Sequence, residues 1–420
     1  MIRMILFFGM ILFWTKSNGQ QNPSIQENKI FKNTILSVQA YNSNNEESIP
    51  VIQLNNGEEI IIEFDELGRA NSNYQYSIEH CTSDWKISPI SKLDYSGGFT
   101  SDRISDYKLS FNTLTKYTHY KFNFPNTRII PKIAGNYIVK VFESGKEKNP
   151  VFTQRIYITN NIATVNIDIT PSEQVNKRNT HQKVNVNLSH NFPISNPNTD
   201  LKVVIMQNFN ALTAKSFTQP TYIRNNSLIY NDMIMNDFPG GSEFRKFDIR
   251  SLRFKGINVQ DIFRDSTNRV ILVVDDANSR FRYTSQFDEN GNFFIQNQDG
   301  RNPKIDADYV NVYFRLKTVK PEPNVRIYVI GRFNNYALTN QNELKYDLQS
   351  QSYFGNILLK QGLYDYKYLW VKDAQLADEN PIEGNFYETE NTYQVFFYYT
   401  KPGSRWEELI SYSNVNTTKR

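Results

Sequence analysis

The sequence contains very little cysteine and histidine: Cys81 is the one cysteine among 420 residues, and only four histidines accompany it. One cysteine excludes an internal disulfide, so the fold must be stabilised by buried surface alone. A chain of this length can bury enough surface for roughly two to four ordinary domains. The sequence therefore predicts several domains without covalent cross-links.

Long apolar runs are also missing beyond the N-terminus. The run at residues 4–14 is about eleven residues long, too short for a permanent membrane-spanning helix, and it follows Arg3 and precedes small polar residues. This pattern predicts a secretory signal peptide at residues 1–19, cleaved near Gly19 and Gln20. No cysteine directly follows the run, which excludes a lipid anchor there. We expect an exported chain that does not insert into a membrane.

Neither sign of charge dominates. Removing residues 1–19 takes away Arg3 and Lys16 and no acid, which leaves 45 of the 47 basic residues against 43 acidic ones, a net charge of +2. The charges are interleaved, as in EFRKFDIRSLRFK at residues 243–255. Nucleic-acid-binding proteins usually concentrate lysine and arginine on one face or in a tail. The sequence therefore predicts no nucleic-acid partner, although distant segments could still assemble a basic patch.

Helical periodicity is nearly absent, whereas the alternation typical of strands recurs along the chain. Residues 183–188 (KVNVNL) and 309–316 (YVNVYFRL) each place apolar side chains on one face. Aromatic residues, which favour strands, make up 14% of the chain. Turn sequences such as Asn56-Gly57 separate the candidate strands. Many short strands of this kind predict an all-β protein with three consecutive immunoglobulin-like β-sandwich domains.

The strand-rich parts of the chain are separated by two segments, residues 159–166 and the proline-containing residues 317–326. They predict an N-terminal β-sandwich over residues 25–160 and a middle β-domain over residues 161–318. The C-terminal β-sandwich is then expected over residues 319–402.

Residues 403–420 are expected to form a short helical turn and a polar tail. Ser404 and Glu407 in the segment SRWEELI have the spacing of a capping box. The turn would be at most one or two turns long, because no apolar period continues beyond it.

Common catalytic motifs are missing: the sequence has no G-x-S-x-G nucleophile elbow, no Walker loop and no H-E-x-x-H metal site. Residues 287–294 (FDENGNFF) begin like a calcium-binding loop but lack its closing glutamate. The favoured interpretation is a hairpin of two strands joined across Asn290 and Gly291, whose residue types suit a turn with positive φ. We therefore expect no enzyme activity, no metal and no cofactor.

The segment HCTSDW brings His80, Cys81, Asp84 and Trp85 together. It could supply metal ligands or an activated thiol if the fold provided further groups. In a strand, however, His80 and Cys81 point to opposite faces and cannot share one ion without a kink. The alternation that precedes them favours a structural role, with a small buried cysteine and a tryptophan packed in a sandwich core.

A series of longer motifs follows one another in a recognisable order: YQYSIEHCTSDWKISPISKLDYSGGF (74–99), YKLSFNTLTKYTHYKFNFPN (107–126), AGNYIVKVF (134–142), GGSEFRKFDIRS (240–251), FDENGNFFI (287–295), DADYVNVYFRL (306–316) and EGNFYETENTYQVFFYY (383–399). Their succession resembles the plug proteins of the type IX secretion system of Bacteroidetes-type bacteria. Within these motifs, the resemblance implies structural and not catalytic roles for His80, Cys81, Asp84, Trp85, Asn290 and Gly291.

The resemblance implies a non-enzymatic protein of the periplasm. It would bind the outer-membrane translocon β-barrel of type IX secretion and seal the periplasmic opening of its pore while the barrel is idle. It implies no catalytic residue, no cofactor and no direct membrane insertion, and we expect a monomer apart from the translocon complex. A near-neutral surface rich in tyrosine and asparagine would suit a reversible seal.

A second resemblance leaves an alternative open. The segment that begins VRIYVIGRFNNY at residue 325 is similar to early-set immunoglobulin-like modules that bind α-glucans by stacking sugars on tryptophans. The corresponding platform would consist here of Tyr336 and Trp370. The alternative function is therefore glycan binding by the C-terminal domain.

Overall fold

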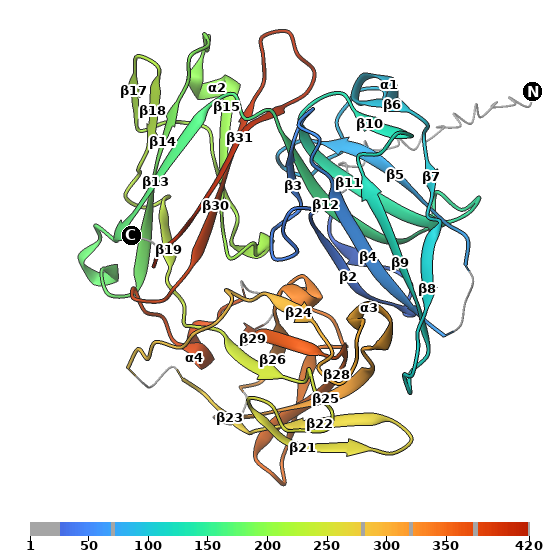
Figure 1. Ribbon diagram of the computed structural model, residues 1–420. Coiled ribbons are helices and arrows are strands. Elements are labelled where there is room, and N and C mark those ends of the chain that lie inside the picture. The colour runs from blue at the N-terminus through green and yellow to red at the C-terminus, as the bar shows by residue number, and fades with distance from the viewer. Residues whose placement is uncertain (1–25, 69–71, 279–281, 319–321, 373–376, 419–420) are drawn as a thin grey trace, which may run out of the picture.

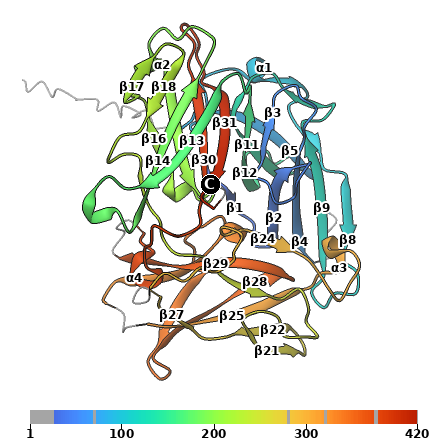
Figure 2. The ribbon, with the colours of Figure 1, turned by 60° about the vertical axis from the view of Figure 1, so that its left-hand side comes forward.

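The computed structural model describes residues 26–68, 72–278, 282–318, 322–372 and 377–418. Strands make up 48% of the structure and helices 7%, which confirms the predicted all-β class. The described residues form three β-sandwiches, and in two views the first and second lie side by side above the third (Figures 1 and 2). The predicted signal peptide lies outside the described residues. In the described part of the chain, no helix is long and apolar enough to cross a membrane.

The first sandwich is built from α1 (Lys92–Tyr95) and the strands β1 (Lys29–Ile30), β2 (Ile35–Asn42), β3 (Val51–Gln53), β4 (Ile60–Leu67), β5 (Tyr74–Cys81), β6 (Ser96–Gly98), β7 (Asp102–Arg103), β8 (Asp106–Leu109), β9 (Tyr117–Phe124), β10 (Ile129–Pro131), β11 (Gly135–Glu143) and β12 (Pro150–Thr159). One sheet has the order β1-β12-β11-β5-β7, with β3 parallel to β12, and the other has the order β2-β4-β9-β8. This sandwich occupies the range predicted for the N-terminal domain.

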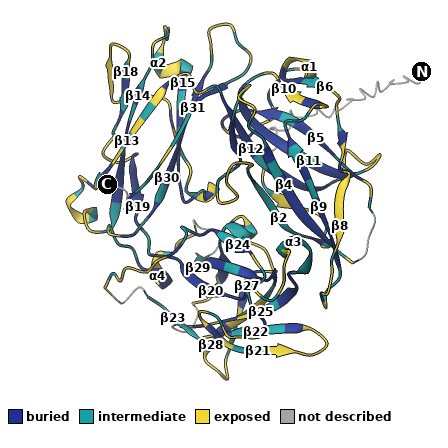
Figure 3. Ribbon diagram, in the orientation of Figure 1, coloured by how far each residue is buried: buried dark blue, intermediate teal, exposed yellow. Residues whose placement is uncertain are grey.

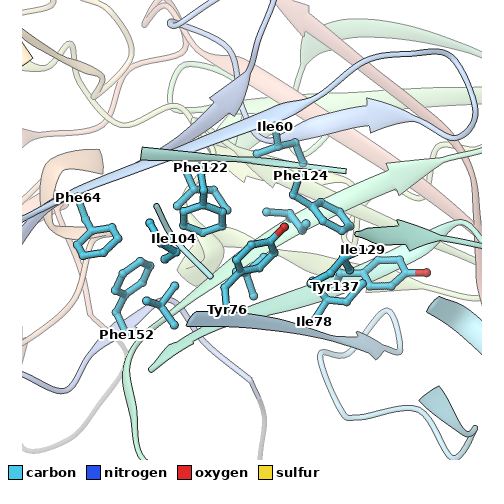
Figure 4. Packing of buried hydrophobic residues seen from close by; sticks show 14 of the residues in the cluster. Ile60, Phe64, Tyr76, Ile78, Ile104, Phe122, Phe124, Ile129, Tyr137 and Phe152 are labelled. Carbon is cyan, nitrogen blue, oxygen red and sulfur yellow. The ribbon is translucent and has the colours of Figure 1, made fainter. Parts of the chain in front are cut away.

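Aromatic rings from both sheets fill the first core (Figure 4). Tyr76 of β5 stacks on Phe122 of β9 with ring centroids 4.4 Å apart, and Phe64 stacks on Tyr120 at 5.0 Å. These residues lie at alternating positions of their strands, so one face of each strand supplies the core. The alternation visible in the sequence therefore produces this layer directly.

The second sandwich combines an early segment with the C-terminal strands: β13 (Thr164–Pro171), η1 (Val175–Lys177), β14 (His181–Ser189), α2 (Pro197–Asp200), β15 (Leu201–Gln207), η2 (Ala211–Thr213), β16 (Lys215–Phe217), β17 (Tyr222–Arg224), β18 (Ser227–Tyr230), β19 (Asp237–Pro239), β30 (Thr392–Tyr399) and β31 (Glu408–Asn416). Its sheets have the orders β13-β14-β18-β17, with β19 beside β14, and β16-β15-β30-β31. Val184, Val186 and Leu188 are buried in the core, as their alternation predicts.

The third sandwich contains α3 (Pro303–Asp306), η3 (Arg332–Asn334), α4 (Asn380–Glu383) and the strands β20 (Arg245–Asp248), β21 (Val259–Arg264), β22 (Asn268–Leu272), β23 (Asp275–Asp276), β24 (Phe293–Ile295), β25 (Tyr309–Lys317), β26 (Val325–Ile330), β27 (Glu343–Asp347), β28 (Ser352–Lys360) and β29 (Gly362–Lys372). The strands join in the order β20-β29-β26-β27-β28-β25-β22-β21. Their inward faces surround one core, whereas much of β21, like β8 of the first sandwich, is exposed (Figure 3).

These sheets divide the chain differently from the predicted boundaries at residues 318 and 402. β25 pairs with β28 across the first boundary, and β30 pairs with β15 of the second sandwich. The third sandwich is thus inserted into the second, because the chain leaves after β19 and returns with β30, so the three sandwiches are not consecutive. Strand partners are chosen by tertiary packing and not by nearness along the chain, and local composition could not show this insertion.

Residues 408–416 form a strand, so the helical turn predicted within residues 403–420 is wrong. Leu409 and Ile410 are both fully buried, at 0% exposure, but in different clusters: Leu409 packs between the first and second sandwiches, and Ile410 packs inside the second. Neighbouring residues of a strand point to opposite faces, and β31 uses this property to bury both side chains. Tertiary packing on two sides therefore outweighs the local capping signal.

Candidate functional site

The histidine of HCTSDW lies in the core of the first sandwich. β5 directs His80 inward, where its Nδ1 atom lies 2.8 Å from Ser88 Oγ and its ring makes an edge contact with Tyr137 at 5.1 Å. Burial lowers the pKa of His80 to about 4, so the ring is neutral near pH 7. A Cβ atom at Gly135 would lie 2.2 Å from the imidazole, which explains the glycine at that position.

Cys81 points to the opposite face of β5, where it joins Trp85 in a separate apolar cluster. Burial raises the pKa of its thiol to about 12, so almost no thiolate exists near pH 7. The described residues contain no group of three or more His, Cys, Asp or Glu that could hold a metal ion. Cys81 and Trp85 are both buried, as the sequence suggested. They lie between two sandwiches, however, and not inside the core of one.

This cluster is the apolar interface between the first and second sandwiches. The ring of Tyr157 on β12 stacks on Phe396 of β30 with centroids 4.6 Å apart, and the edge of Trp85 meets Tyr157 at 5.2 Å. The guanidinium of Arg155 covers the Trp85 ring at 4.4 Å. Two sheets therefore meet face to face through large aromatic side chains, which is the packing of a domain core.

Polar contacts surround this apolar interface. The Tyr398 hydroxyl donates to Asn136 at 2.8 Å, and Lys202 forms an ion pair with Asp84 at 2.9 Å. The backbone N–H of Ser83 donates to the Glu407 carboxylate at 2.5 Å. Asp84 and its neighbours in HCTSDW thus connect the first sandwich to the second.

The first and third sandwiches meet through a buried charged network. The Lys360 ammonium lies 2.6 Å from Asp65, whose second oxygen lies 2.7 Å from His119 Nδ1, and the Tyr309 hydroxyl donates to Asp65 at 2.8 Å. Burial alone would raise the pKa of Asp65, but Lys360 and His119 outweigh it and hold the pKa below its usual value. A buried charge needs such partners to remain ionised.

The same network explains why two buried positions, 65 and 360, carry charged residues. Sequence reasoning missed Asp65 and Lys360, although EIIIEFDEL places Glu63 and Asp65 on one face of an apolar strand. An ionisable group on a buried strand face indicates a charged partner. Lys360 lies 295 positions away from Asp65, so the sequence could indicate the need for a partner but not its identity.

Further hydrogen bonds join the first sandwich to the segment around α3. The Asp308 carboxylate accepts the backbone N–H groups of Leu114 and Thr115, at 2.5 and 3.0 Å. Lys304 bridges Glu63 at 2.5 Å and Glu46 at 2.6 Å. Charged and backbone contacts therefore predominate at this interface, beside one edge contact between the rings of Tyr117 and Tyr309 at 5.4 Å.

The turn of FDENGNFF has the predicted conformation but not the predicted hairpin. Asn290 and Gly291 have φ of 52° and 83°, yet β24 after the turn pairs with β29 and not with the residues before it. Both oxygens of Asp288 accept backbone N–H groups, from Phe244 and Asn290. A Cβ atom at Gly291 would lie 2.5 Å from the Tyr336 hydroxyl. The turn is thus a packed structural element.

Tyr336 and Trp370 do not form the sugar platform of the alternative function. Tyr336 is 3% exposed, and its hydroxyl donates to the Asn208 carbonyl of the second sandwich at 3.0 Å. It packs with Leu369 in one cluster, whereas the neighbouring Trp370 packs against the third core. Adjacent residues of β29 face opposite ways, so the two rings share no surface. Tyr336 instead connects the second and third sandwiches.

Two buried carboxyl groups near the turn have strongly raised pKa values. Burial raises the pKa of Glu243 and of Asp365 to about 7, and the nearby Asp288 contributes to both shifts. Asp365 accepts the backbone N–H groups of Glu289 and Gly291, at 2.5 and 3.3 Å. The folded protein therefore binds protons here more tightly than the unfolded chain does, so the free energy of unfolding falls as pH rises from about 4 to 7.

Replacing Asp365 with asparagine is expected to stabilise the protein at pH 8, on the order of 2 kcal/mol, with an effect that shrinks as the pH falls and is small near pH 4. The amide keeps an acceptor for both N–H groups but cannot ionise. Urea unfolding at several pH values measures the effect, and Asp168→Asn, at an exposed position of β13, serves as control. A variant less stable than the wild type at pH 8 would contradict this explanation.

Together, the fold and its interfaces define a multidomain β-protein in which the residues described above join one sandwich to another. A family model described as "Type 9 secretion system plug protein 1st domain" matches residues 35–160, which comprise most of the first sandwich. Among curated proteins, no match to the chain was found. A solved structure, of a hypothetical protein from Parabacteroides merdae, is 30% identical and has a TM-score of 0.90 over 94% of this chain and 100% of that chain.

The chain therefore belongs to the type IX secretion system plug protein family. This family is a structural and non-catalytic kind of protein, and membership indicates association with the secretion machinery and a periplasmic location near the outer membrane.

Proposed function

We propose that this protein is a non-enzymatic periplasmic plug. It binds the periplasmic opening of the outer-membrane translocon β-barrel of type IX secretion and closes the pore while no cargo passes. Family membership supports the association with this machinery. The sealing role goes further and is an inference from the shape and rigidity of the molecule.

The observation that carries the proposal is the way each sandwich contacts the other two. The first and second share the aromatic contact of Tyr157 and Phe396, the first and third share the buried pair of Asp65 and Lys360, and Tyr336 connects the third to the second. Such contacts hold a broad body in one shape without a disulfide. A plug must resist deformation across a wide opening, and a body fixed on three sides suits this task.

An epitope-tagged copy is expected to co-purify with the translocon barrel after mild detergent extraction, whereas a periplasmic protein of similar size with the same tag is not. Deletion of the gene is expected to admit large antibiotics that the intact outer membrane excludes, and the tagged copy should restore exclusion. N-terminal sequencing of that copy should begin at Gln20. Recovery of only free monomer, together with unchanged permeability in the deletion strain, would refute the proposal.

A further inference from the structure

A cleft of about 780 Å³ opens where the three sandwiches meet, and each of them contributes to its lining. We call it the junction cleft. Its walls include the 42–53 segment of the first sandwich, the ends of β30 and β31 of the second, and the turn at residues 287–292 of the third. Eleven of its 26 lining residues are asparagine or glutamine. The junction cleft is therefore rich in side chains that can both donate and accept hydrogen bonds.

One wall continues the sheet face that packs against the first sandwich. Cross-strand pairs on this face run from Phe396 and Tyr412 to Gln394 and Asn414, and then to Thr392 and Asn416. Phe396 is covered by the first sandwich, whereas the last two pairs line the junction cleft. The face thus changes from apolar to polar towards the junction cleft, first at the buried Gln394 and then at the exposed Asn414.

The amides of this wall differ in whether they are free to bind a ligand. Asn416 already donates to Glu390 and accepts from Thr418. The side chain of Asn414, two positions earlier on β31, uses its amide nitrogen as a donor, but its Oδ1 atom accepts no hydrogen bond from the described residues. Because an amide side chain carries a donor and an acceptor, as a peptide unit does, its free atoms can bind a backbone whatever the side chains are. The Oδ1 atom of Asn290, in the turn of the third sandwich, is also without a hydrogen-bond partner.

The charge of the lining selects a cationic occupant. Five carboxylates line the junction cleft, against one cation, Arg332. Burial raises the pKa of Glu289, and the nearby Glu47 raises it further, so these carboxylates disfavour each other's charge. A positively charged side chain that entered the junction cleft would relieve this repulsion.

The aromatic residues of the lining do not favour a sugar. Phe209 contacts Tyr157 at 6.1 Å and carries the Arg332 guanidinium 5.5 Å from its ring centroid, and Tyr412 packs on Phe396 at 5.1 Å. Phe287, at the rim, has an ammonium group 4.5 Å from its ring centroid. Each ring therefore already has a partner, whereas carbohydrate sites use open ring faces for stacking.

We propose that the junction cleft binds an extended, basic segment of a partner polypeptide, held by amide hydrogen bonds to its backbone and by the carboxylates to its lysine or arginine side chains. This inference does not depend on pore sealing, since it concerns binding by the isolated protein. Binding at this place would connect all three sandwiches through a single ligand.

Fluorescence anisotropy with the purified protein tests the proposal, using a labelled peptide of about eight residues with alternating lysine and threonine. We expect saturable binding that weakens as salt is added. A peptide with glutamate in place of lysine should not bind. N-methylation of the threonine residues keeps the charge but removes backbone donors, and it should weaken binding at least about tenfold. These peptide arms use the wild-type protein and do not depend on the folding of a variant.

The double substitution Asn44→Arg and Asn414→Arg places a cation on two walls of the junction cleft, at exposed positions. It should weaken binding at least about tenfold. The matched control, Asn225→Arg with Asn356→Arg, adds the same charge at exposed positions outside the cleft and should leave binding within about twofold. No binding of the lysine peptide, equal effects of the two double variants, or full affinity after N-methylation would each overturn the proposal. Displacement of the peptide by a glucose hexasaccharide would overturn it in favour of a sugar site.

Discussion

Replacing Lys360 with methionine is expected to lower the free energy of unfolding by about 3–5 kcal/mol. The side chains of Lys360 and Asp65 are both 1% exposed, so the substitution leaves a carboxylate in a region from which water is excluded. Methionine fills a similar volume, and the loss therefore reports the missing ammonium partner of Asp65, which keeps only His119 and the Tyr309 hydroxyl, and not a cavity. Urea unfolding at pH 7 measures the change.

The exposed pair of Lys255 and Asp261 provides the control, because its lysine is 58% and its aspartate 42% exposed. Lys255→Met should change the free energy of unfolding by no more than about 0.5 kcal/mol. Adding Asp65→Asn to Lys360→Met removes the stranded charge and should recover part of the stability. If Lys360→Met costs no more than the control, the charged network does not hold the first and third sandwiches together.

Replacing Phe396 with alanine is expected to destabilise the protein by about 3–4 kcal/mol and to uncouple the first sandwich from the second. Phe396 is 1% exposed, and its ring stacks on Tyr157 at 4.6 Å. Without the ring, a cavity opens between two sheets that belong to different sandwiches. Differential scanning calorimetry should show one transition in the wild type and two in the variant.

Phe354→Ala is the matched control, because this ring on β28 is 49% exposed and the same truncation there leaves no cavity. We expect its effect to stay within about 0.5 kcal/mol, with a single transition. A single transition in Phe396→Ala as well would mean that the remaining contacts, including Tyr398 with Asn136, suffice to couple the two sandwiches. The aromatic stack would then not be what couples them.

The two interfaces differ in the kind of force that fixes the sandwiches. The aromatic contact of Tyr157 and Phe396 gains from area removed from water, whereas Lys360 and Asp65 fix a position because neither charge tolerates separation from its partner. If the protein seals a pore, both variants should seal poorly even though their outer surface is unchanged. Residues such as Trp85 would then serve the function by keeping the sandwiches in fixed positions, and not by supplying a reactive group.

Local patterns predict the parts of the fold that depend on local geometry. Alternation at residues 309–316 identifies the buried face of β25, where Val310 and Phe314 lie in the third core. Asn290 and Gly291 indicate a turn, because few residue types accept the positive φ that both adopt. Strand geometry alone also predicts that the side chains of His80 and Cys81 point to opposite faces of the sheet. In each case one residue and its immediate neighbours decide the outcome.

The sequence by itself determined that this is an all-β protein without disulfides and without a motif for chemistry, because composition, alternation and turn chemistry act over a few residues. Only the tertiary structure decided that β30 returns to β15, that Cys81 and Trp85 lie between two sandwiches, and that Tyr336 is closed off from solvent. The physical reason is that strand edges and exposed faces can accept many partners of similar composition. Which partner they take depends on the combined packing of segments hundreds of residues apart, such as Asp65 and Lys360.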